Sequence, residues 1–196
     1  MMNSTLIASV IAAGACSAAW GSEPLMPQAD FRMVTQMHDQ SSGMTIDAEL
    51  RHSDGRFRME TEFQGQAAVV LIDSAAETVT ILVDMGGMRI AMDMTSEESS
   101  FDVPTADDRL GEPIGTDVVA GEPCTIYRFE AEDAPGGEAE GCLTHDYIVL
   151  RVNVPDEGAV FEAREFERAA QEDRWFVVPD GYRRMSMGAM GGAFPR

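Results

Sequence analysis

Apolar and polar residues alternate with a period of two through the first half of the chain, and this alternation narrows the choice of fold more than any other feature. The clearest stretches are residues 56–63, with the sequence RFRMETEF, and residues 88–94, with the sequence MRIAMDM. Successive side chains of a β-strand point to opposite faces of a sheet, so this pattern is typical of strands with one face against a core and the other in water.

Short turn signals separate these stretches. Clusters rich in Gly, Ser, Asp and Gln lie at 40–43, 53–55, 64–65, 73–77 and 85–87. The runs at 66–72 and 77–83 are more continuously apolar, so we expect them to form the more buried strands. Residues 30–94 therefore predict a six-stranded antiparallel meander with tight turns.

Residues 95–115 interrupt the pattern with a long acidic and Pro-containing segment. Loops of this length are uncommon inside a compact domain and often act as a lid or plug, although a mobile acidic loop without a role is the alternative. A short helix around 106–110 is compatible with the sequence. Further strands are expected at 116–120, 124–131, 142–153, 159–169 and 174–178. The segment 160–170 also fits a helical stripe, but its neighbours favour a strand.

The N-terminus resembles a secretory signal peptide. Residues 1–22 carry no charged side chain, and 6–19 form an apolar, Ala-rich run that ends in small residues. Cleavage after Gly21, Ala19 or Ala18 fits the small-residue rule, while Cys16 leaves a lipoprotein site open as an alternative. We predict removal of residues 1–21, one domain over 22–182, and a flexible Met- and Gly-rich tail over 183–196. The expected location is the periplasm, and the protein is not expected to be an integral membrane protein.

Removal of the signal peptide would leave two cysteines, Cys124 and Cys142, in an oxidising compartment. A turn cluster at 133–137 lies near the midpoint between them, so a hairpin would place them almost directly opposite one another, within disulfide distance. A redox-active or metal-binding pair is the alternative, but the spacing is not Cys-x-x-Cys. We therefore predict a structural disulfide.

The net charge of −20 comes with no lysine at all, since every basic residue is arginine. Such a surface repels nucleic acid backbones and anionic headgroups, which excludes nucleic acid as an expected partner. Dense like charge also makes a solvated acidic surface the simplest interpretation, rather than a dedicated cation site.

No signature of an enzyme or cofactor site is present in the sequence. It contains no phosphate-binding glycine loop, no Gly-x-Ser-x-Gly and no His-Glu-x-x-His, and its three histidines are scattered. We therefore predict a non-enzymatic protein without a cofactor.

Methionine is the one unusual enrichment. Thioether clusters suit Cu(I), which makes copper handling through the C-terminal methionines an alternative function. These are Met185, Met187 and Met190. A second group consists of Met85, Met88, Met92 and Met94. The simpler explanation for this group is that these methionines line the inner face of a strand.

Several short stretches, taken in order, resemble a bacterial envelope family of unknown function whose fold is grouped with the lipoprotein carriers LolA and LolB. They are DGRFRME at 54–60, VLID at 70–73, VAGEPCTIY at 119–127, GCLT at 141–144 and FVVPDGY at 176–182. The resemblance implies a mainly β fold: a strongly curved antiparallel sheet, an unclosed half-barrel, with a short loop or helical plug over its concave apolar face. In the carrier relatives that concavity holds acyl chains.

The leading hypothesis is a periplasmic protein that binds an apolar or amphipathic ligand, such as a lipid, on the concave face of the sheet. The alternative from another class is an envelope interaction module whose acidic surface binds a protein partner. The residues expected to line the ligand site are Phe57, Met59, Phe63, Met88, Ile90, Met92, Tyr127 and Phe129.

Overall fold

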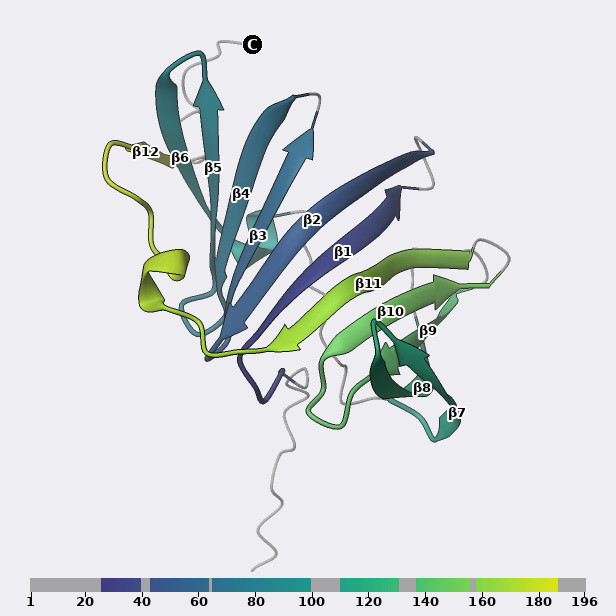
Figure 1. Ribbon diagram of the computed structural model, residues 1–196. Coiled ribbons are helices and arrows are strands. Elements are labelled where there is room, and N and C mark those ends of the chain that lie inside the picture. The colour runs from purple at the N-terminus through teal and green to yellow at the C-terminus, as the bar shows by residue number, and fades with distance from the viewer. Residues whose placement is uncertain are drawn as a thin grey trace, which may run out of the picture.

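The computed structural model describes residues 26–39, 43–63, 65–99, 110–130, 137–155 and 158–186. In these ranges, twelve strands form one sheet and the only helices are two short 3₁₀ turns (Figure 1). None of the described helices is long and apolar enough to cross a membrane. The predicted signal peptide, most of the 106–110 helix and most of the proposed plug lie outside these ranges.

The fold is the mainly antiparallel, unclosed sheet that the sequence predicts. The strands run in the order β12-β6-β5-β4-β3-β2-β1-β11-β10-β9-β8-β7. Their bounds are β1 Phe31–Asp39, β2 Met44–Ser53, β3 Arg56–Phe63, β4 Gln66–Asp73, β5 Thr78–Met85, β6 Met88–Thr95, β7 Pro113–Val119, β8 Glu122–Glu130, β9 Glu138–Leu143, β10 Val149–Val154, β11 Gly158–Arg168 and β12 Arg183–Ser186. The meander β1 to β6 confirms the prediction for residues 30–94, and β11 confirms a strand where a helix was the alternative.

Tight two-residue turns join three of the hairpins, β2–β3 and β5–β6 of the meander and β7–β8. At 54–55, 86–87 and 120–121 both central residues have positive φ. This is the backbone of a type I′ turn, whose twist matches that of the flanking strands. Glycine at the second position of each turn adopts this conformation without steric cost.

The sheet is strongly curved where β7, β8 and β9 turn away from the plane of the other strands (Figure 1). Arg151 of β10 and Asp117 of β7 form an ion pair although β9 and β8 lie between them. In a flat sheet, strands three positions apart are about 14 Å from each other. The ion pair therefore bridges the inside of this curve.

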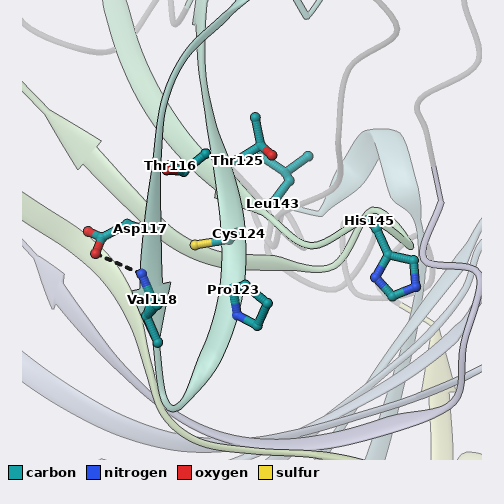
Figure 2. A pocket seen from close by; sticks show the side chains of 8 residues that line it. All are labelled: Thr116, Asp117, Val118, Pro123, Cys124, Thr125, Leu143 and His145. Carbon is teal, nitrogen blue, oxygen red and sulfur yellow. Dashed lines mark hydrogen bonds between the residues drawn. The ribbon is translucent and has the colours of Figure 1, made fainter.

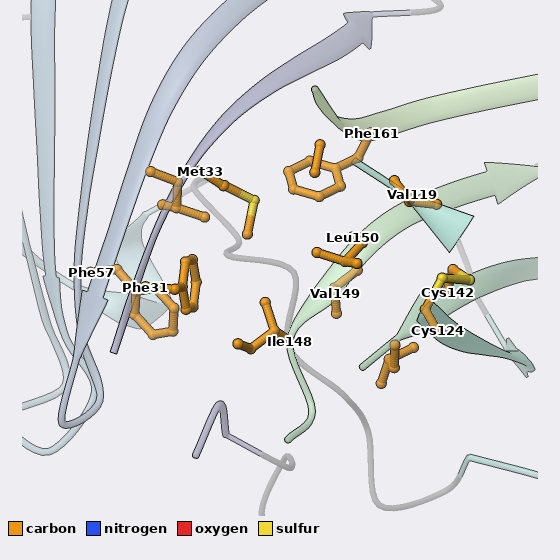
Figure 3. Packing of buried hydrophobic residues seen from close by; sticks show 13 residues of the cluster. Phe31, Met33, Phe57, Val119, Cys124, Cys142, Ile148, Val149, Leu150 and Phe161 are labelled. Carbon is orange, nitrogen blue, oxygen red and sulfur yellow. A yellow bond between two sulfur atoms is a disulfide. The ribbon is translucent and has the colours of Figure 1, made fainter. Parts of the chain in front are cut away.

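The main core lies between the two halves of the sheet (Figure 3). Phe31 and Met33 of β1 and Phe57 of β3 extend towards Ile148 and Leu150 on the other half. Each of these five side chains is at most 2% exposed. Burying such large side chains stabilises the fold by about 1.5–3 kcal/mol each.

The predicted disulfide joins Cys124 to Cys142, with a Cα–Cα distance of 5.4 Å. The sequence predicts that the two cysteines lie almost directly opposite one another, but in the structure they are offset. Cys142 pairs with Ile126, so the bond runs diagonally between β8 and β9. Both cysteines are buried in the main core.

The single strand expected at 142–153 is wrong, because a turn at 144–148 divides it into β9 and β10. The Thr144 hydroxyl accepts a hydrogen bond from the Ile148 N–H, and Tyr147 adopts a φ of 61°. A hydroxyl that binds the backbone four residues later stabilises a turn in competition with a continuous strand.

Residues 169–182, here called the C-terminal strap, lead from β11 across the outer face of β2 to β6. The strand expected at 174–178 is wrong, since residues Asp173–Phe176 form the 3₁₀ turn η2. Val178 and Tyr182 of the strap pack against Leu71, Leu82 and Ala91. The chain then forms β12, which pairs in parallel with β6, so the sheet continues past residue 182, where the sequence predicted the tail to begin.

A second 3₁₀ turn, η1, covers Ser96–Glu98 at the start of the segment predicted to form a plug. Thr95 and Glu98 form a capping box that fixes this turn. The other end of the segment, from Pro113, belongs to β7.

Candidate functional site

The inner face of β3 to β6 is a continuous apolar surface. Strand register places Met59, Val70, Ile81 and Met92 in one row across these four strands. The adjacent row consists of Thr61, Ala68, Val83 and Ile90. We call the part of this face formed by these two rows the inner patch.

Charge is segregated between the two faces of these strands. By register and alternation, every charged residue of β3 to β6 lies on the outer face, and the inner face has none. The outer-face charged residues are Arg56, Arg58, Glu60, Glu62, Asp73, Asp84, Arg89 and Asp93. A neutral apolar surface on one side of a sheet therefore faces away from a strongly charged side.

The inner patch is partly open to solvent. Met59, Ile81, Val83 and Met92 are half-buried, whereas Val70 is 1% exposed. An apolar surface whose centre is closed and whose margins are accessible suits an apolar ligand, because binding removes the remaining apolar area from water.

The structure brings together four of the residues that the sequence predicts to line the ligand site. Met59 and Met92 lie in one row of the inner patch, and Ile90 lies in the next row, 8% exposed. Phe57 lies on the same face but is 2% exposed within the main core, where it packs against His52 with ring centroids 4.6 Å apart. Its accessible surface is too small to contact a ligand directly.

The other four predicted residues are less central. Met88 lies at the β5–β6 hairpin and is 57% exposed, and the side chain of Phe63 is outside the described part of the structure. Tyr127 and Phe129 are half-buried in β8, which five strands separate from β3. They therefore do not share a row with the methionines of the inner patch.

A pocket of about 520 Å³ opens beside the disulfide, and no sequence motif predicts it. Its lining comes from β7, β8, the end of β9 and the turn that follows β9 (Figure 2): Thr116, Asp117, Val118, Pro123, Cys124, Thr125, Leu143 and His145. The Arg151 guanidinium donates to the Asp117 carboxylate and lowers its pKa. The only cysteine in this lining is oxidised, so the pocket offers no thiol nucleophile.

A second pocket, of about 400 Å³, lies on the outer face beneath the C-terminal strap. Arg56 and Arg184 line it together with Asp73, Asp93 and apolar residues of β4 and the strap. Arg56 donates to Asp173 at 2.8 Å and Arg184 to Asp93 at 3.3 Å. Both cations are therefore already paired with carboxylates of the chain.

His52 is the one deeply buried histidine of the described residues, 1% exposed. One ring nitrogen lies 3.0 Å from the Ala29 carbonyl oxygen, and the other accepts a hydrogen bond from the Gly55 N–H. Burial lowers its pKa. Both nitrogens are thus occupied in holding the β2–β3 turn, which leaves neither for catalysis or metal binding.

Within the described ranges, no group of three or more His, Cys, Asp or Glu side chains is placed to hold a metal ion.

Comparison with known proteins gives similarity at the level of fold. No protein family model matches the sequence, and no curated protein matches it. The solved structure of PNGF-II matches 83% of this chain with a TM-score of 0.51 and 11% identity, and this chain spans 32% of that protein. At that identity the likeness concerns the fold alone.

Structures of MucB are also similar. One MucB structure has a TM-score of 0.44 and 15% identity, and covers 79% of this chain and 58% of MucB. The MucA/MucB complex of Pseudomonas aeruginosa has a TM-score of 0.43 and 16% identity, and covers 78% of this chain and 56% of the matched one. This chain thus spans a third of PNGF-II and little more than half of MucB.

Proposed function

We propose that the protein is a non-enzymatic binding protein of the periplasm that takes an apolar or amphipathic ligand, such as a lipid, on the inner patch. The observation that carries this proposal is the segregation of charge: the inner face of β3 to β6 has no charged residue, and its margins are half-buried. The Cys124–Cys142 disulfide supports an oxidising compartment.

The composition of the patch also suits ligands of variable shape. Met59 and Met92 lie at its two ends, with Val70 and Ile81 between them. Methionine is unbranched and polarizable, so it adapts to irregular apolar surfaces. If a ligand removed about 200 Å² of apolar surface from water, the hydrophobic effect at about 25 cal/mol/Å² would contribute about 5 kcal/mol to the binding free energy. The cost of association must be subtracted from this value.

Two neighbouring alanines of β4 allow a matched test. Ala68 lies on the inner patch and is half-buried, whereas Ala67 lies on the outer face and is exposed. A fluorescent fatty-acid probe should bind the delipidated protein with micromolar affinity. Ala68→Arg should weaken binding at least tenfold, because it places a cation in the apolar row. Ala67→Arg, opposite Glu62, should leave binding unchanged.

The isosteric change Val83→Thr adds a hydroxyl to the same row with little change in volume, and serves if Ala68→Arg does not fold. Equal binding by the wild type, Ala68→Arg and Val83→Thr would reject the inner patch as the site. Native mass spectrometry of protein gently purified from its own envelope provides the second measurement. A discrete mass addition removed by organic extraction supports the proposal, and a bare polypeptide with no probe binding rejects it.

A protein partner is the second candidate, and the exposed strand β7 favours it. Within the described residues β7 pairs only with β8, and six of its seven residues are exposed, including Ile114 at 47% and Val118 at 63%. An exposed strand edge can bind an extended segment of another protein. A photo-crosslinking residue at position 118 should then give a discrete adduct in cells, and the same residue at the exposed position 67 should not.

A further inference from the structure

The two methionine-rich segments of the chain meet at one edge of the sheet. β12 pairs in parallel with β6, and Met185 is the register partner of Met92 (Figure 1). In the sequence these methionines form two separate groups, one near the C-terminus and one in the 85–94 segment. The fold places them side by side.

Three thioether side chains share the inner face at this edge. Met92 and Met94 are two residues apart on β6, so their backbones are about 7 Å from each other, and Met185 lies one strand spacing, about 4.8 Å, from Met92. All three are half-buried. Methionine has three rotatable bonds, which lets sulfur atoms at these separations converge on a common point.

The register of this edge is fixed from the outer face. Asp93 of β6 accepts from Arg184 of β12 at 3.3 Å and from the Thr80 hydroxyl of β5 at 2.8 Å. Tyr182, just before β12, packs against Leu71, Leu82 and Ala91 on that same face. These contacts hold Met185 beside Met92 rather than one residue out of register.

We propose that Met92, Met94 and Met185 form a site for Cu(I). Soft thioether sulfur selects Cu(I) over hard divalent cations, and three neutral sulfur ligands leave a monocation in a neutral apolar setting. The inner face of β6 has no charged residue, and the nearest cation on that face of β12, Arg183, is the partner of Ile90, on the side away from Met94. The net charge of −20 raises the local concentration of any cation near the surface.

The test uses Ag(I), a redox-stable probe with the same preference for sulfur, and the full exported protein with ¹³C-labelled methionine methyl groups. One equivalent of Ag(I) should shift three methyl resonances, assigned by Met92→Leu, Met94→Leu and Met185→Leu. Leucine keeps the volume and apolar character of methionine but removes the sulfur. Each variant should weaken Cu(I) binding, measured anaerobically against a chelator, on the order of tenfold or more.

Met59→Leu is the matched control, since Met59 lies in the same row as Met92 but three strands away. It should leave the Cu(I) affinity unchanged. The inference is overturned if no methionine resonance shifts with Ag(I). It is also overturned if Met187→Leu together with Met190→Leu abolishes binding while Met92→Leu and Met94→Leu do not, because the ligands then belong to the tail alone.

This site overlaps the inner patch, so the two proposals need separate readouts. The Met94→Leu, Met185→Leu double variant should lose Cu(I) affinity but still bind the fatty-acid probe, because neither residue belongs to the two rows of the inner patch. A wild-type protein that binds Ag(I) through the three methionines but does not bind the probe would count against the proposed function and leave the metal site standing.

Discussion

Asp146 should contribute about 2 kcal/mol to stability at neutral pH. Its carboxylate lies in the turn between β9 and β10 and accepts two hydrogen bonds from Arg168 of β11, from Nε at 2.8 Å and from Nη2 at 3.0 Å. The Thr144 hydroxyl donates to the same carboxylate. The Arg168 guanidinium is the largest cause that lowers the pKa of Asp146 from 3.8 to about 2.

The magnitude follows from linkage between protonation and folding. A folded-state pKa of about 2, against the ordinary value of 3.8 in the unfolded chain, corresponds to about 2 kcal/mol. Because the folded pKa is the lower one, this contribution is complete above pH 4 to 5 and is lost as the pH falls towards 2. The Asp146 side chain is only 10% exposed, so solvent screens the pair less than a surface ion pair.

Asp146→Asn should therefore lower the free energy of unfolding at pH 7 by about 2 kcal/mol, or the melting temperature by roughly 4–8 °C for a domain of this size. Urea denaturation at several pH values measures it. The difference between the variant and the wild type should shrink towards zero between pH 4 and pH 2. Glu122→Gln is the control: Glu122 also accepts from Arg168, at 2.8 Å, but both side chains are about 30% exposed, so the expected loss is under 1 kcal/mol.

Two results would refute this reasoning. The first is a loss below 0.5 kcal/mol for Asp146→Asn at pH 7. The second is a difference from the wild type that stays constant down to pH 2, which would mean that the substitution acts through packing rather than through the charge of Asp146.

Three further predictions concern other parts of the fold. Stability should fall as the pH drops below about 6.5, because burial lowers the pKa of His52 in the folded protein and protonation breaks the hydrogen bond that it accepts from the Gly55 N–H. In NMR spectra of the folded protein, the ring resonances of His52 should not titrate near pH 6.5. Replacing Cys124 by alanine should cost about 3 kcal/mol in urea denaturation, as expected for a closed loop of this size, and reductant should have no effect on the variant. Arg58→Ala should loosen the C-terminal strap, since Arg58 is 8% exposed and its Nη1 donates to the Trp175 carbonyl at 3.0 Å. The strap should then be proteolysed faster and the fluorescence of Trp175 should change. An unchanged rate of proteolysis would contradict this prediction.

The strands and turns that depend only on neighbouring residues could be predicted from the sequence. Alternation at 56–63 and 88–94 predicted β3 and β6, and the turn residues between them predicted the meander, because two-residue turns depend on their own φ angles. The cysteine pairing was also predictable, although the diagonal register was not.

Elements decided by distant contacts were not predictable. The short β12 is a strand because β6 offers it an edge, and nothing in residues 183–186 alone distinguishes it from a tail. Residues 174–178 are apolar enough for a strand, but the packing of Trp175 over Arg51, with 4.4 Å between the guanidinium and the ring centroid, fixes them as part of the strap. Phe57 belongs to the main core because of contacts with β1, β2 and the other half of the sheet, and its place in an alternating strand does not distinguish it from a residue of the ligand site.

The parallel pairing of β12 with β6 also constrains the order in which the molecule can assemble. All of β7 to β11 and the C-terminal strap lie between these two strands in the sequence. The free edge of β6 therefore stays unprotected until nearly the whole chain has been synthesised and the strap has crossed the outer face. An unpaired, apolar strand edge is a template for pairing with other chains. β12 therefore completes the sheet last and covers the edge of β6 against pairing with neighbouring molecules.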